Sequence, residues 1–190
     1  MEEELQNEET ASATSPIQHA AKFGAILGVI GAIITLLLYV INPALLINVW
    51  MLALLLVYIV LVVYGGITYR KEIGGYIDFG PAYLHGFVTF VVMGLISLMI
   101  NFLLYNIVDS SLPEVLTDAS MEQTASMMEK FGAPESAIEE AMEQQRPEIE
   151  AGFTNFGLIK GFFTSLIFYA VISLITGLIV RRREKVSDVY

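Results

Sequence analysis

The chain has no cysteine, which removes two kinds of structure at once. It excludes a disulfide framework and a metal site built on thiolates. Charged residues are also scarce, at 16% of the 190 residues, whereas soluble domains carry about 25%. The catalytic motifs His-Glu-x-x-His, Gly-x-Ser-x-Gly and the phosphate-binding loop are missing. We therefore expect no enzyme, no cofactor and no metal site. The formal net charge of −10 argues against a nucleic-acid partner, because phosphates would be repelled.

The longest stretch without any Asp, Glu, Lys or Arg covers residues 23 to 69, which is 47 residues. One bilayer crossing needs about 20 apolar residues, so this stretch holds two crossings. Asn42 and Pro43 interrupt it near the middle. This pattern predicts an antiparallel transmembrane hairpin and excludes an ordinary soluble helical core.

Two further charge-poor runs complete the predicted architecture. One covers residues 81 to 108, and the other covers residues 153 to 180 and is interrupted only by Lys160. The fold class is therefore predicted to be all-α, a polytopic membrane protein with four transmembrane helices. The expected spans are residues 20–41, 45–69, 81–108 and 156–180. Residues 1–18 are expected to form a disordered acidic tail, and residues 184–190 a second tail.

The distribution of basic residues predicts the orientation in the membrane. The base-rich side carries these seven residues: Lys22, Arg70, Lys71, Arg181, Arg182, Arg183 and Lys185. The other side carries an uncharged turn and an acidic segment. Cytoplasmic loops are the ones enriched in Lys and Arg. We therefore expect both termini in the cytoplasm and residues 109–153 outside it.

The segment between the third and fourth spans, residues 109–153, is the only long water-facing one. It holds eleven acidic residues against Lys130 and Arg146. Its apolar residues recur at helical spacing, Gly132 can end one helix and Pro134 can begin another. The stretch from Ser111 to Glu114 resembles a capping box. We expect a short extracytoplasmic helical hairpin.

Small residues recur at every fourth position on the first and fourth spans, and Gly94 lies on the small, polar face of the third. Such residues let membrane helices approach closely. The helix-packing candidates are Gly24, Gly28, Gly94, Gly157, Gly161 and Ser165. Packing, rather than ligand binding, is the expected role of all six.

Few polar groups fall in or near the spans. Gly94, Ser97, Asn101 and Tyr105 would share one face of the third helix. His85 is expected to be an interfacial hydrogen-bonding residue, with a proton-relay or ligand role as the alternative. 

Lys160 lies one turn inside the fourth span. It would either extend its stem to the headgroups or pair with Asp109 at the end of the third helix.

The loop after the second span carries a recognisable string, Tyr69-Arg-Lys-Glu-Ile-Gly-Gly-Tyr-Ile-Asp-Phe-Gly-Pro-Ala-Tyr83. Together with Lys22-Phe-Gly24 and Met127-Met-Glu-Lys-Phe-Gly132, it resembles a bacterial family of four-helix membrane proteins that carries a domain of unknown function and is common in Bacteroidetes. The likeness covers residues 19 to 183. It implies a membrane topology and a bacterial inner-membrane location, and it implies no activity.

These observations predict a non-catalytic integral membrane protein that acts as a scaffold or accessory subunit. Its expected partners are the lipid bilayer and either a second copy of the chain or another membrane protein. The alternative is a small transporter or channel subunit that works as an oligomer. The polar row on the third helix is the one feature in favour of that alternative.

Overall fold

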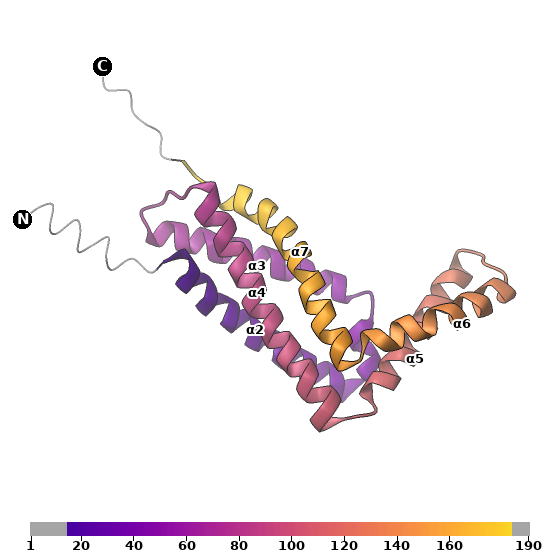
Figure 1. The fold of residues 1–190 in the computed structure, drawn as a ribbon. Helices are drawn as coiled ribbons and strands as arrows, with labels where there is room; N and C mark the ends of the chain where they lie inside the picture. The colour runs from indigo at the N-terminus through magenta and orange to yellow at the C-terminus, as the bar shows by residue number, and fades with distance from the viewer. Residues whose placement is uncertain (1–14, 184–190) are drawn as a thin grey trace, which may run out of the picture. The chain divides into compact units, whose positions relative to one another are not determined.

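The computed structural model describes residues 15–183, and Figure 1 shows the course of the chain. Every regular element in this range is a helix. The elements are α2 (Pro16–Ile41), η1 (Pro43–Ile47), α3 (Met51–Glu72), α4 (Phe79–Leu103), η2 (Leu104–Val108), α5 (Leu112–Lys130), α6 (Glu135–Gly152) and α7 (Asn155–Val180). The predicted all-α class is therefore confirmed for the described residues.

Four helices are long and apolar enough to cross a membrane: Pro16–Ile41, Met51–Glu72, Phe79–Val108 and Asn155–Val180. The exposed surfaces of these helices are apolar, as are the surfaces by which they pack against one another. On α2, for example, Ile33 and Leu37 are more than half exposed. A soluble bundle would bury such side chains, whereas a membrane span presents them to lipid. The four apolar helices suggest a multi-pass membrane protein.

The chain divides into two compact units, and the four long helices contribute to both. The first unit contains residues 1–27, 56–93 and 167–190, of which 15–27, 56–93 and 167–183 are described. Its core has two clusters. One centres on Leu27, Val62 and Phe90, and the other on Tyr69, Ile77 and Val180.

The loop from α3 to α4 in this first unit is held by two local devices. Gly74 and Gly75 have φ angles of +98° and +88°, which end α3 in a conformation that favours glycine. Ile77 then pairs with Arg182 through two backbone hydrogen bonds, of 2.9 and 3.0 Å. In addition, Arg70 donates a hydrogen bond to the carbonyl of Val180, at 2.6 Å. A guanidinium at the carboxyl end of α7 complements its dipole.

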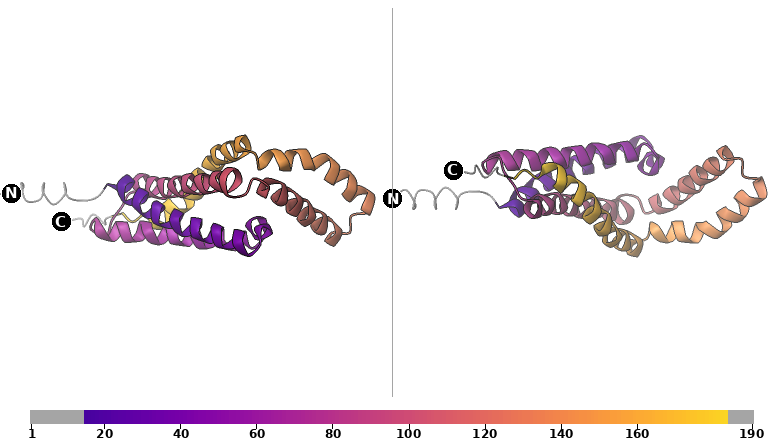
Figure 2. Two further views of the ribbon diagram at one scale, coloured as in Figure 1. Left: turned by 90° about the horizontal axis from the view of Figure 1, so that it is seen from below. Right: turned by 90° about the horizontal axis from the view of Figure 1, so that it is seen from above.

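The second unit contains residues 28–55 and 94–166. Its core cluster is formed by Leu104, Tyr105, Leu112 and Leu116, each at most 8% exposed. The helices α5 and α6 lie side by side as a hairpin, as the views in Figures 1 and 2 agree. Gly132, with φ of +79°, makes the turn between them. The segment expected to be helical after the third span thus forms two helices with a turn at Gly132, and its extracytoplasmic location stays a prediction.

Some predicted boundaries were wrong, and the hydrogen bonds explain why. The first helix begins at Pro16 rather than residue 20, so residues 15–18 are not part of a disordered tail. Ser15 and Gln18 cap each other: Ser15 Oγ accepts from Gln18 N at 3.2 Å, and Gln18 Oε1 accepts from Ser15 N at 3.4 Å. This is a capping box. The rest of the predicted tails, residues 1–14 and 184–190, lies outside the described residues.

The second span begins at Met51 rather than residue 45, because η1 occupies the interval. Asn42 Oδ1 accepts a hydrogen bond from Ala44 N and begins η1, and Asn48 Oδ1 accepts one from Trp50 N after it. The third span ends in a π-helical turn, η2, closed by Asp109 N donating to the carbonyl of Leu104 at 2.8 Å. 

The capping box expected at Ser111 is absent. Instead, the Ser111 hydroxyl donates to Asp109 Oδ1 at 2.6 Å.

Candidate functional site

The two histidines of the chain lie against each other in the first unit. His19 stands on the first turns of α2, and His85 stands near the start of α4. His19 Nδ1 lies 2.9 Å from His85 Nε2, and the His85 side chain is 1% exposed. In a contact of this kind one ring nitrogen donates its hydrogen and the other accepts it. The pair is therefore a part-buried hydrogen bond between two titratable rings.

The aromatic ring of Tyr69 packs against both histidines. The ring of Tyr69, from α3, stacks on His85 with centroids 5.5 Å apart and an interplanar angle of 16°. The same ring lies 5.0 Å from His19. Thr89, also buried, donates its hydroxyl hydrogen to the carbonyl of His85 at 2.8 Å. Residues from three helices thus fix the position of the two rings.

An acidic side chain lies beside His19, on the side of the pair away from His85. Glu72 Oε2, at the end of α3, lies 3.7 Å from His19 Nε2. The Glu72 side chain is 54% exposed and that of His19 is 18% exposed. An ion pair this exposed contributes little to stability. Glu72 is nevertheless the acidic side chain that the described residues place beside the outer nitrogen of His19.

The sequence analysis singled out His85 but missed His19 as its partner. The signal available was small: the chain has only two histidines, and each lies near the base-rich end of a predicted span. The interpretation of His85 as a hydrogen-bonding residue agrees with the contact that the structure shows. The proton-related alternative stays open at this point.

The predicted polar row on the third helix does not form a continuous buried face. Ser97 is exposed, Asn101 is half-buried, and Asn101 Nδ2 donates to Ser97 Oγ over 3.5 Å. Tyr105 is buried, but it packs in the apolar cluster with Leu112 and Leu116. Polar contact in this second unit is made elsewhere, where the side-chain amides of Asn106 and Asn155 exchange two hydrogen bonds of 2.8 Å.

Among the six packing candidates, the three on the first and third spans are buried. A Cβ added to Gly24 would lie 2.7 Å from the backbone carbonyl oxygen of Thr89. A Cβ added to Gly28 would lie 2.6 Å from the side chain of Ile96. Gly94 is buried as well. The first two glycines are therefore needed for close helix approach.

The candidates on the fourth span behave differently. A Cβ on Gly157 would collide with the backbone of Ala151 and Gly152, so this glycine accommodates the end of α6. A Cβ on Gly161 would meet nothing within 4 Å, and Ser165 donates its hydroxyl hydrogen to the Gly161 carbonyl of its own helix. A helix contact at Gly161 is thus absent from the structure, because the face carrying it is open.

Asp109 at the start of the outer segment is engaged by neighbours other than Lys160. It accepts hydrogen bonds from the hydroxyl and backbone N–H of Ser111 and from the Tyr39 hydroxyl, the last at 3.1 Å. These hydrogen bonds lower the pKa of Asp109 below its ordinary value, and the bond from the Ser111 hydroxyl has the largest effect. Lys160 is exposed and makes no ion pair within residues 15–183. The contacts therefore favour the extended, water-seeking Lys160 over the pairing alternative.

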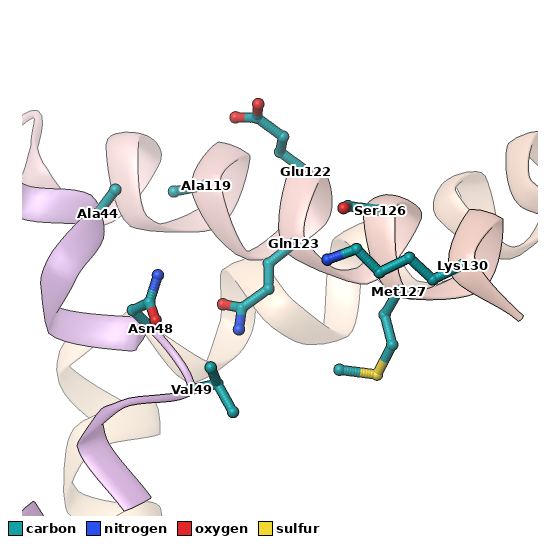
Figure 3. A pocket seen from close by; sticks show the side chains of 9 residues that line it. All are labelled: Ala44, Asn48, Val49, Ala119, Glu122, Gln123, Ser126, Met127 and Lys130. Carbon is teal, nitrogen blue, oxygen red and sulfur yellow. The ribbon is translucent and has the colours of Figure 1, made fainter. Parts of the chain in front are cut away.

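A hollow of about 430 Å³ lies between η1 and α5 in the second unit (Figure 3). Figure 3 shows Asn48 on one wall and Gln123 on the other, whereas the carboxylate of Glu122 points away. The remaining lining residues are Ala44, Val49, Ala119, Ser126, Met127 and Lys130. This mixture has no convergent set of catalytic groups. It is an open surface depression beside the hairpin.

The turn of the hairpin carries an isolated aromatic side chain. Phe131 is 85% exposed, and Met127, one turn earlier on α5, is 49% exposed. The charged residues nearest to it in the sequence are Glu129, Lys130 and Glu135. Arg146 Nη2 lies 2.8 Å from Asp118 Oδ1 and joins α6 to α5. An exposed Phe contributes nothing to the hairpin's own packing. It is therefore a candidate contact for another molecule.

Over residues 15–183 the structure has no group of three or more His, Asp or Glu side chains placed to hold a metal ion. Comparison with known proteins identifies a family for this chain. A family model described as "Protein of unknown function (DUF4199)" matches residues 22–182. No curated protein and no solved structure matches the chain.

Proposed function

The chain belongs to the DUF4199 family, and we propose that it works as a non-catalytic, multi-pass membrane subunit that binds a partner protein through its α5–α6 hairpin. The observation that carries this proposal is Phe131, 85% exposed at the turn of a hairpin whose own core it does not join. Aromatic side chains that are exposed in the free protein are common anchors of protein interfaces. 

We propose in addition that the protein resides in the inner membrane of a bacterium, with both termini in the cytoplasm and the hairpin outside. The support is the base-rich side of the sequence and the family resemblance of the loop from Tyr69 to Tyr83.

The chemistry of the hairpin favours a basic protein as the partner. Residues 109 to 152 carry eleven acidic side chains and two basic ones. Such a surface is repelled by anionic lipid headgroups, so the membrane surface is a poor partner for Phe131. It attracts a positively charged protein surface and would steer its approach. Met127, which faces the hollow beside η1, extends the apolar contact from the turn along α5.

A photo-crosslinking amino acid at Phe131 tests this proposal in cells that produce the full chain. The control places the same amino acid at Phe163, which is 62% exposed on α7 and faces lipid in this account. We expect a discrete crosslink to a second protein from position 131 and none from position 163. Phe131→Ala should lower co-purification of that protein about tenfold or more, as hot-spot truncation does, while Phe163→Ala leaves it unchanged.

The alternative, a transporter or channel subunit, gives a different result in the same preparation. It predicts crosslinks from Phe131 only to further copies of the chain, or none, together with ion flux when the purified protein is placed in liposomes. That combination would overturn the proposal of a partner-binding subunit.

A further inference from the structure

We propose that His19 and His85 form a proton-binding site, in which one added proton is held by the pair and balanced by the carboxylate of Glu72. The inference rests on the 2.9 Å contact of the two rings, the burial of His85 and the 3.7 Å approach of Glu72 to His19. It goes beyond the proposed partner-binding role and does not depend on it.

Counting hydrogens on the four ring nitrogens shows why the pair takes one proton. Two neutral rings carry two N–H groups. One of these lies in the contact between His19 Nδ1 and His85 Nε2, and the other lies on an outer nitrogen. One added proton fills the second outer nitrogen and leaves the shared N–H in place. A second added proton would put hydrogens on both contacting nitrogens and force the rings apart.

The charge of the protonated pair has one nearby counter-charge. Glu72 lies beside His19 Nε2, which is an outer nitrogen and carries a hydrogen in the singly protonated state. The Glu72 carboxylate therefore favours proton uptake. Because Glu72 is half exposed, the proton reaches His19 from water without passing through the apolar core.

The other groups around the pair do not replace Glu72. From α3, Tyr69 contributes its ring face, and Arg70 is directed to the carbonyl of Val180. From α2, Lys22 is exposed, and from α4, Thr89 bonds the His85 carbonyl. The hydroxyl of Thr176 on α7 faces Gly86, the residue after His85. Glu72 is thus the one carboxylate that the described residues place against the two rings.

Proton uptake touches three helix ends. The shared hydrogen bond joins α2 to α4 before and after uptake, and the added proton contributes only the attraction between Glu72 and His19, which joins α3 to α2. Because that ion pair is exposed, its effect on stability should be small, and the titration itself is the measurable signal. An imidazole is the side chain suited to such a response, because it titrates near neutral pH.

The experiment is a nitrogen NMR titration of the full chain in nanodiscs, with ¹⁵N in the histidine rings. The chain has only two histidines, so every signal belongs to the pair. Between pH 8 and pH 5 we expect uptake of one proton, with both rings changing at one common midpoint. Uptake of two protons, or separate and independent midpoints for the two rings, would overturn the proposal.

Two variants complete the test. Glu72→Gln should lower the midpoint, since it removes the facing charge. Asp78→Asn is the matched control, because Asp78 is an exposed acid in the loop that follows Glu72, and the ion pair with His19 is made by Glu72. It should leave the midpoint unchanged, and equal behaviour of the two variants would contradict the role of Glu72. His19→Gln should shift the titration of His85, and an unshifted His85 would contradict the pair.

Discussion

Single glycines on the long helices differ in what a methyl group would meet, and this difference decides their tolerance of substitution. A Cβ on Gly24 lies 2.7 Å from a backbone oxygen, which cannot rotate away as a side chain can. A Cβ on Gly161 meets open space. Overpacking typically costs about 1 to 3 kcal/mol, whereas Gly→Ala at an open helical site gains up to about 1 kcal/mol.

The same substitution should therefore act with opposite signs at these two positions. Gly24→Ala should lower the melting temperature in detergent by several degrees, and Gly161→Ala should leave it unchanged or raise it slightly. Leu37→Ile, at a lipid-facing position, gives the baseline for a neutral change. Equal effects at Gly24 and Gly161 would show that the helix contact at Gly24 is not tight.

Asp109 gives a pH dependence whose sign follows from its hydrogen bonds. Its pKa is lowered from the ordinary value of 3.8, chiefly by the Ser111 hydroxyl. A lowered pKa means that the carboxylate stabilises the fold fully above pH 3.8 and loses this contribution as the pH falls through the lower folded value. The gap in melting temperature between the wild-type chain and Asp109→Asn should therefore be constant from pH 7 to pH 5 and close below pH 4. A gap that stays unchanged at pH 3 would contradict this account.

At the scale of elements, the α5–α6 hairpin is fixed at its root. Leu112 and Leu116 are at most 1% exposed and pack with Leu104 and Tyr105, whereas α6 has no buried residue. Leu116→Ala should cost about 2 to 5 kcal/mol, because it leaves a cavity in this cluster. Val115→Ala, its neighbour at 41% exposure, should cost less than 1 kcal/mol. 

Hydrogen exchange measures where this loss occurs. Leu116→Ala should speed exchange of the α5 amides and leave α2 protected. An equal loss of protection in α5 and α2 would show that the hairpin does not unfold separately from the long helices.

Local features of the fold could be predicted from the sequence, whereas contacts between distant helices could not. Charge-free runs located four spans, and Gly132 with Pro134 located the turn of the hairpin, because these signals are local. The start of α2 was missed because its capping box, Ser15 to Gln18, directly follows a stretch rich in Ser, Thr and Ala that reads as a continuation of the tail. The pair of His19 and His85 was missed for a different reason. The two residues are 66 positions apart, and helices that are apolar on every side do not reveal which faces meet.

At the scale of the whole molecule, we propose that the base-rich ends lie on one side of the membrane and the acidic hairpin on the other. The natural absence of cysteine makes every introduced cysteine the only one in the chain. The variants Ser136→Cys, at an exposed position in the first turn of α6, and Ser187→Cys, near the carboxyl terminus, report on the two sides.

The most direct test of this account is the labelling of these two variants with a membrane-impermeant thiol reagent in intact cells. We expect Ser136→Cys to be labelled in intact cells and Ser187→Cys only after the membrane is opened. Labelling of Ser187→Cys alone in intact cells would contradict the orientation, and equal labelling of both would contradict the separation of the hairpin from the termini by the membrane.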